Sequence, residues 1–346
     1  LRFDEPILPS SLTVSKFDLV SVQSSNAAEQ SVQLAGQVAL GEQDTVATID
    51  IASSTVNAIK AKRALAINST SAFLRFTSSA VTDTNNNSIQ ATTANTAFGP
   101  AQPFAADSTA PSVLNGTVDL TLQQATLFFD EPIAPETFKA TSFQFQNLNP
   151  QVSVRLAHTT VLSGVSRELQ LQLTQDDIDR VMLNLALCRS ASSCSLYMDT
   201  GAIEDTQGNA IAGFSALVPS SFTPDSVQPQ LTGALLDVDK SLLSLNFSEA
   251  MHLSSLDATR LVLVDTAEYE GALPLQPPLM EESGRGWVQL THNTVLSSEY
   301  TAVNGTTLAL TLAALDLQRV QRFLPCATAD ARPGTASCEL VGFDSA

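Results

Sequence analysis

The sequence is poor in positive charge, and it has no long apolar run. Its 346 residues include 17 Lys and Arg against 35 Asp and Glu, which gives a net charge of −18. So few cations argue against a nucleic-acid surface, because binding to phosphates requires clustered positive charge. No apolar run approaches the roughly 20 residues that cross a bilayer, so we expect no membrane span within this chain.

Histidine, tryptophan and tyrosine are scarce as well. His158, His252 and His292 are the only histidines, and they are far apart in the sequence, which leaves little for acid–base or metal chemistry near neutral pH. No nucleophile-elbow, phosphate-loop, zinc-helix or dinucleotide motif is present. One Trp and three Tyr also weaken a lectin interpretation. We therefore expect a protein without enzymatic activity.

What the sequence does contain is internal repetition. LRFDEPI from residue 1 recurs as LFFDEPI from residue 127 and as LNFSEAM from residue 245. AVTDTNNNSI from residue 80 recurs as AIEDTQGNAI from residue 202, and DSTAPSVL from residue 107 aligns with DSVQPQLT from residue 225. An apolar run followed by a short amphipathic piece starts near residues 48, 171 and 308. We call these recurring segments landmarks. Because they occur in the same order each time, they indicate a repeat of about 120 residues.

The landmarks predict three domains, at residues 1–106, 107–224 and 225–346, with proline-bearing linkers before the second and third. The first repeat begins inside its FDEP landmark, and the third ends before its copy of the AxxDxxxN landmark. We therefore expect the outer two repeats to be truncated and the chain to be a piece of a longer protein.

The sequence pattern of each repeat predicts short strands and one short helix. In the second repeat the pattern predicts strands at 127–130, 143–147, 152–156, 169–173 and 195–198, and helices at 175–182 and, in the third repeat, 313–322. The acidic run Asp176-Asp177-Ile178-Asp179 fits the first turn of such a helix better than a glycosidase carboxylate pair. The expected fold class is all-β, with tandem immunoglobulin-like β-sandwich repeats.

The DEP triplet of the second repeat has two interpretations. Pro132 cannot donate to a strand ladder, so Asp130-Glu131-Pro132 is expected to end its strand with solvated charges. The alternative is calcium, held where Glu131 meets Asp107 or Asp225 at a linker, because Ca²⁺ takes an all-oxygen shell. The third repeat has Ser248-Glu249-Ala250, so only the Glu is constant. The main expectation is therefore no cofactor. Asp83 and Asp205 are expected to begin Asx-type turns.

Four cysteines occur as two close pairs, Cys188 with Cys194 and Cys326 with Cys338. At the positions of the first pair, the first repeat has Ala66 and Ala72, so both cysteines are replaced together. A zinc site would need four ligands, and no histidine lies near either pair. We therefore predict two disulfides and an oxidising compartment. Five N-x-S/T sequons agree with a secreted glycoprotein, at Asn68, Asn86, Asn115, Asn246 and Asn304.

The order FDEPI, an NAIK-type helix at residues 56–60, the cysteine pair and AxxDxxGN resembles the tandem immunoglobulin-like repeats of very large extracellular proteins. Such repeats occur in algae, other protists and some bacteria, including S-layer-type modules, and mastigoneme filament proteins of flagella are similar. The resemblance implies a secreted structural protein at the cell surface. Its partners would be neighbouring repeats, other copies of itself, and glycans.

Two alternatives remain open. The charge of −18 and the linker aspartates motivate a calcium-stiffened cell adhesin. An accessory module of a carbohydrate-active enzyme rests on analogy alone. The insertion at residues 268–286, with three prolines, is the candidate for a special contact in any of these roles.

Overall fold

The computed structural model describes residues 1–26, 28–41, 44–93, 95–100, 103–264, 287–297, 305–323 and 339–341. The chain divides into two compact units. The first comprises residues 1–173 and 190–224, and the second comprises residues 174–189 and 225–346. The predicted repeat boundary at residue 107 falls inside the first unit, whereas the one at residue 225 coincides with a change of unit.

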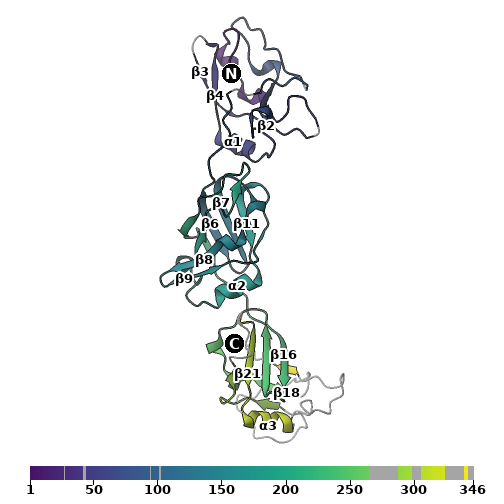
Figure 1. Ribbon diagram of the computed structural model, residues 1–346, viewed down its shortest axis with the longest axis vertical. Coiled ribbons are helices and arrows are strands. Elements are labelled where there is room, and N and C mark those ends of the chain that lie inside the picture. Colours follow the sequence, from purple (N-terminus) through teal and green to yellow (C-terminus); the bar gives the residue numbers. More distant parts are fainter. Residues whose placement is uncertain are drawn as a thin grey trace. The chain divides into compact units, whose positions relative to one another are not determined.

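The described residues are mostly strands with three short α-helices, as the all-β prediction requires (Figure 1). Residues 1–106 form an antiparallel sheet of order β2-β1-β5 and a separate hairpin, β3-β4, followed by helix α1. Phe17, Leu34 and Ala80 form one buried apolar cluster there, and Val20, Phe73 and Ala97 form another. The elements are β1 (Phe17–Val20), β2 (Ser31–Gln33), β3 (Gly36–Leu40), β4 (Ala47–Ile51), α1 (Ser53–Lys60) and β5 (Phe73–Phe76).

Residues 107–224 form two sheets. In the first, of order β10-β11-β7-β6-β15 with β13 added to β7, only β15 runs parallel to its neighbour. The second has the order β14-β12-β8-β9. The strands of the first sheet are β6 (Val113–Asp119), β7 (Gln124–Ala134), β10 (Thr160–Val161), β11 (Ser166–Gln172), β13 (Glu204–Asp205) and β15 (Ser221–Thr223). Those of the second are β8 (Phe143–Leu148), β9 (Gln151–Arg155), β12 (Ser195–Met198) and β14 (Phe214–Leu217).

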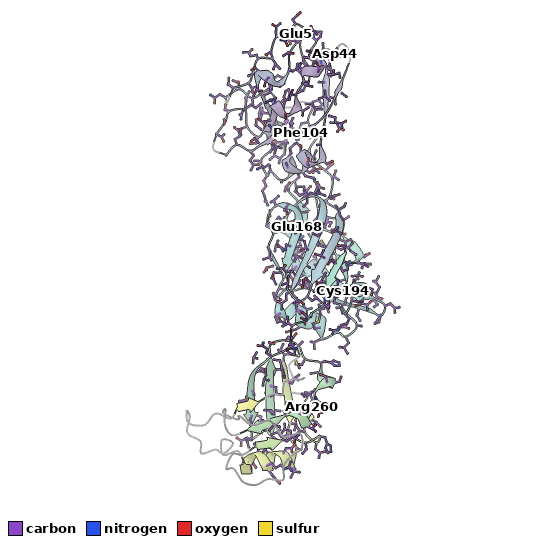
Figure 2. All side chains as sticks on the ribbon, turned by 180° about the vertical axis from the view of Figure 1, so that it is seen from behind. Glu5, Asp44, Phe104, Glu168, Cys194 and Arg260 are labelled. Atoms are coloured by element: carbon purple, nitrogen blue, oxygen red, sulfur yellow. The ribbon has the colours of Figure 1, made fainter. Side chains whose placement is uncertain are left out.

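These two sheets pack face to face. A Cβ added at Gly116 of β6 would lie 2.8 Å from Leu196 Cδ1 of β12, so the glycine allows the close approach. Alternating residues of both sheets are buried, because side chains along a strand point to opposite faces. The buried set includes Leu127, Phe129, Leu169 and Leu171 from one sheet and Phe143, Phe145, Leu196 and Met198 from the other. Cys194 immediately precedes β12 (Figure 2).

The second unit has the sheets β16-β17-β21-β20 and β19-β18-β22, with helices α2 and α3. Residues of both sheets and of α3 share one apolar core, which includes Leu245, Leu263, Leu310 and Val320. The elements are α2 (Gln175–Met182), β16 (Leu231–Asp237), β17 (Leu242–Phe247), β18 (Val262–Val264), β19 (Trp287–Gln289), β20 (Val295–Leu296), β21 (Thr307–Thr311), α3 (Ala314–Phe323) and β22 (Glu339–Val341).

Local geometry recurs at the spacing of the sequence landmarks. Short 3-10 helices that begin at Pro9, Pro135 and Leu253 follow the three FDEP-type landmarks. Ala66 and Cys188 both have a positive φ, of 54° and 52°, at aligned positions. Helices α1, α2 and α3 follow strands β4, β11 and β21 after one to two residues. The predicted helix at 175–182 is confirmed, and the one predicted at 313–322 begins one residue later.

Candidate functional site

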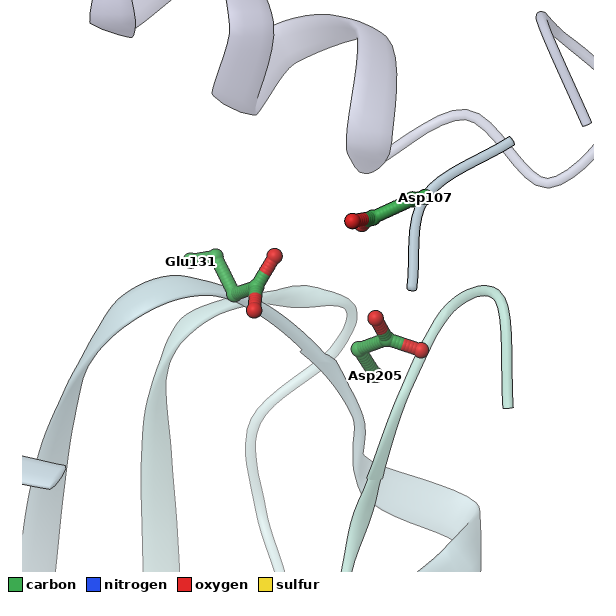
Figure 3. Close-up of side chains that lie close together, drawn as sticks. All are labelled: Asp107, Glu131 and Asp205. Carbon is green, nitrogen blue, oxygen red and sulfur yellow. The ribbon is translucent and has the colours of Figure 1, made fainter. Parts of the chain in front are cut away.

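Three carboxylates of the first unit converge, and each comes from a sequence landmark. Asp107 lies in the segment before β6, Glu131 lies in β7, and Asp205 ends β13. Each offers a carboxylate oxygen, and these oxygens all lie within 4.8 Å of one another. Figure 3 shows the three carboxyl groups turned toward the same space. Glu131 and Asp205 are only 5% and 3% exposed. Of the three sequence-predicted metal candidates, the structure thus brings together Asp107 and Glu131.

Glu131 is buried because β7 does not end where the sequence indicated. The strand continues through Asp130-Glu131-Pro132 to Ala134, so the predicted strand end is wrong. Asp130 is exposed as predicted, but Glu131 is buried. The pairing with β11 shifts, so that Phe128 lies opposite Glu168 and Ile133 lies opposite Ser166. The intervening β7 residues form an irregularity outside the regular ladder, where a proline without an N–H is tolerated. This irregularity carries Glu131 into the cluster.

Asp205 is held by its own turn, as the sequence predicted. Its Oδ1 accepts hydrogen bonds from the backbone N–H groups of Gln207 and Asn209, each at 2.8 Å, and its Oδ2 accepts one from Asn209 Nδ2. Asp83 makes the same set of bonds with Asn85 and Asn87. The recurring Asp-x-x-x-Asn pattern therefore stabilises a turn in both repeats. In the second repeat the same aspartate, Asp205, also contributes its carboxylate to the cluster.

Lys60, the last residue of α1, supplies positive charge to the cluster. Its Nζ lies 2.8 Å from Asp107 Oδ2 and also donates to Glu131 Oε2. Burial acts to lower the pKa of Lys60, but hydrogen bonds and charge from Asp107 and Glu131 outweigh it, and the pKa is raised. The Lys60 carbonyl accepts a hydrogen bond from Thr206 Oγ1, beside Asp205. Lys60 was not among the predicted site residues, although it ends the NAIK-type helix at residues 56–60.

Glu131 has more negative than positive charge around it. Burial raises its pKa most, Lys60 opposes this, and Asp107 and Asp205 raise the pKa further. Its second oxygen, Oε1, is buried and has no hydrogen-bond partner among the described residues. One ammonium thus faces three carboxylates.

Asp225, the third candidate, lies in a different cluster, in the second unit. It lines a pocket of about 590 Å³ together with Glu249 and Met182. Asp179 of α2 also faces this cluster, because its Oδ1 accepts a hydrogen bond from the Ala250 N–H at 2.9 Å. Burial, followed by the charge and hydrogen bond of Asp225 and the charge of Asp179, raises the pKa of Glu249 to about 7.

The predicted covalent and modification sites divide between described and undescribed residues. Cys188 and Cys194 are both disulfide-bonded. Asn68, Asn86, Asn115 and Asn246 are exposed, which an acceptor asparagine requires, although Asn115 and Asn246 lie in strands β6 and β17. Cys326, Cys338, Asn304 and the insertion at 268–286 lie outside the described residues.

The residues considered for catalysis are not gathered into one site. His158, His252 and His292 are each exposed. In the acidic run, Asp177 lies in the first turn of α2, where its backbone N–H donates to Thr174 Oγ1 of the N-cap. Asp176 and Asp177 thus lie in the first turn of the helix, as the sequence predicted, whereas Asp179 of the same run accepts the hydrogen bond from Ala250. No described helix is long and apolar enough to cross a membrane.

The sequence matches no protein-family model, and no curated protein matches it.

Proposed function

We propose that this chain is a non-catalytic run of immunoglobulin-like structural repeats from a secreted, glycosylated filament or cell-surface coat protein of the mastigoneme-like kind. The observation that carries the proposal is the contact between consecutive repeats in the first unit. The last residue of α1, Lys60, pairs with Asp107 in the following linker and with Glu131 in the next repeat. Arg63 pairs with Glu136 alongside.

Such contacts suit an array that resists bending. Repeat proteins gain reach and stiffness from interfaces between neighbours, since each unit contacts only the next one. Lys60 also accepts a hydrogen bond on its carbonyl oxygen from Thr206 in the next repeat, so the helix end is held by both side chain and backbone. The linker residue Asp107 is bonded to both repeats, since its carboxylate pairs with Lys60 and its carbonyl accepts a hydrogen bond from Asn209 Nδ2. Such bonds favour a mechanical role over a flexible tether.

Two facing sheets in residues 107–224, antiparallel except for β15, support the immunoglobulin-like assignment, because about 100 residues in two antiparallel sheets is typical of that class. The recurrence of the 3-10 helices and of the helix after each aligned strand supports the tandem arrangement. The disulfide and the exposed sequons favour an oxidising, extracellular location. The separated, exposed histidines give no reason to add a catalytic role.

Electron microscopy of material taken from the native cell surface tests this function. An antibody against residues 107–224 should label filaments or an ordered coat, and antibody pre-absorbed with the purified chain should not. A label confined to dispersed single molecules would contradict the structural role.

A calcium-stiffened adhesin is a second candidate, favoured by the convergence of Asp107, Glu131 and Asp205. The same microscopy with and without a calcium chelator separates the two. Filaments that persist in chelator favour the plain structural array, whereas filaments that bend or collapse favour the adhesin.

A further inference from the structure

We propose that Asp107, Glu131 and Asp205 form a divalent-cation site suited to Ca²⁺, which the ion enters by displacing the ammonium group of Lys60. This inference does not depend on the proposed structural role, since the chain can bind the ion whether or not it forms filaments.

The spacing of the oxygens fits a shared ion. Ca²⁺ binds oxygen ligands at about 2.3–2.6 Å, so two ligands of one ion lie no more than about 5 Å apart. The three carboxylate oxygens lie within 4.8 Å of one another, which meets that limit for every pair. Their donors are all oxygens, the set that Ca²⁺ prefers over nitrogen and sulfur.

A buried, unpartnered oxygen is the second observation. Glu131 is 5% exposed, and its Oε1 has no hydrogen-bond partner among the described residues. Leaving a buried carboxylate oxygen without a donor costs free energy that a bound cation would recover. Glu131 is aimed at the space that Asp107 and Asp205 also face (Figure 3).

The negative charge of the cluster favours a divalent ion over the singly charged ammonium of Lys60. With all three carboxylates ionised, one ammonium leaves the cluster at a net charge of −2, and a divalent ion in place of the ammonium would reduce this to −1. The raised pKa of Glu131, caused first by burial, is consistent with that unbalanced charge.

Lys60 is able to leave. Its side chain is 21% exposed, compared with 6% for that of Glu131, so the ammonium has access to water. The four-carbon stem is flexible and can keep apolar contact while its charged end moves to solvent. The backbone of Lys60 stays in place through its carbonyl and Thr206.

Isothermal titration of the whole 346-residue chain with CaCl₂, after chelator treatment, tests the proposal. Four proteins are compared: the native chain, Glu131→Gln, Lys60→Met and the control Glu168→Gln. Methionine is the residue that α2 carries at the aligned position, Met182. Glu168 is an exposed carboxylate on the adjacent strand β11, so its substitution makes the same chemical change outside the cluster (Figure 2).

The native chain and Glu168→Gln should bind Ca²⁺ with equal affinity at this site. Glu131→Gln should weaken that binding at least tenfold, and Lys60→Met should strengthen it at least tenfold because the competing ammonium is gone. Equal affinity in the native chain and Glu131→Gln would overturn the proposal. So would binding that occurs only in Lys60→Met, since the native lysine would then exclude the ion.

Two further measurements keep the result specific. Circular dichroism of each variant without calcium checks that it is folded, so that lost binding reports on the site. Titration of Glu249→Gln separates this site from the carboxylates of the second unit, and its Ca²⁺ affinity should equal that of the native chain. A loss of binding in Glu249→Gln alone would assign the ion to the other cluster and overturn the proposal.

Discussion

The two units carry carboxylate clusters that are built on the same landmarks, but the neighbouring helix contributes a different charge to each. In the first unit, Asp107 and Glu131 meet the ammonium of Lys60 from the end of α1. In the second, the aligned residues Asp225 and Glu249 meet Asp179 from α2, a further carboxylate. At the position of Lys60, α2 carries the uncharged Met182, and Asp179, three residues earlier in α2, adds a negative charge to the second cluster. The helix, and not the landmark, decides the local charge.

The comparison also explains why the DEP triplet varies. Asp130 Oδ1 accepts a hydrogen bond from the Ser112 N–H at 2.8 Å, and Ser248 Oγ accepts one from the Gln230 N–H at 2.9 Å. Aspartate and serine therefore make the same hydrogen bond at the aligned position, since the side-chain oxygen of each accepts from a backbone N–H of the linker. The Glu that follows is the same in each repeat, and the charge beside it depends on the neighbouring helix.

Removing the cation from the first cluster should have the largest effect. Without added calcium, Lys60→Met leaves Glu131 buried beside two carboxylates and should lower the free energy of unfolding by about 2 kcal/mol, less than the 3–5 typical of fully buried pairs because Lys60 is partly exposed. Urea denaturation at pH 7.5 measures this. A variant as stable as the native chain would show that the ion pair has no net value.

The second cluster should make stability depend on pH. The pKa of Glu249 is raised from 4.5 to about 7 in the folded chain, so the folded state binds this proton more tightly than the unfolded state. Its stabilising contribution is therefore present below about pH 4.5 and is lost as the pH rises to about 7. Glu249→Gln should be more stable than the native chain at pH 8, by about 1–2 kcal/mol after allowing for partial exposure.

Melting curves at pH 5 and pH 8 check the effect of Glu249→Gln. The difference between the two proteins should nearly vanish at pH 5. An equal difference at both values would mean that Glu249 does not titrate in this range.

Transferring the lysine should make the second cluster resemble the first. Met182 lines the pocket with Asp225 and Glu249, so Met182→Lys places an ammonium near both carboxylates. It should lower the pKa of Glu249 and stabilise the chain at pH 8 by about 1 kcal/mol. Leu185→Lys, at an exposed position of the same pocket, is the control for added charge alone. Equal effects of the two variants would argue against specific pairing.

The exposed ion pair beside the first cluster should matter least. Arg63 and Glu136 side chains are 50% and 52% exposed, and such pairs contribute about 0–0.5 kcal/mol. Arg63→Ala should therefore leave the urea midpoint nearly unchanged at moderate salt. A loss comparable with that of Lys60→Met would mean that long-range charge, and not burial, holds the first cluster together.

Much of the local structure could be read from the sequence. The helix at 175–182 and the strand at 195–198 have the predicted bounds, because periodicity and turn residues mark both. The turns begun by Asp83 and Asp205 also follow from local chemistry, since an Asp side chain bonds to backbone groups two and four residues ahead. Interactions of this kind need only neighbours in the sequence.

The course of β7 could not be read in this way. Pro132 argued for a strand end, and only the shifted register against Ser166 lets the strand continue and buries Glu131. Register depends on which strand lies alongside, and that information is not contained in the triplet itself.

The sequence by itself determined the repeats, the short elements and the residues at each landmark, because these depend on contacts a few positions apart. The tertiary structure decided which landmarks meet. Lys60 and Glu131 are 71 residues apart, and Asp107 and Asp205 are also distant in the chain. Whether the Glu shared by the repeats faces an ammonium or another carboxylate follows from how a helix packs against the residues that follow it. The charges of those neighbours then modify the pKa, which burial raises most in both Glu131 and Glu249.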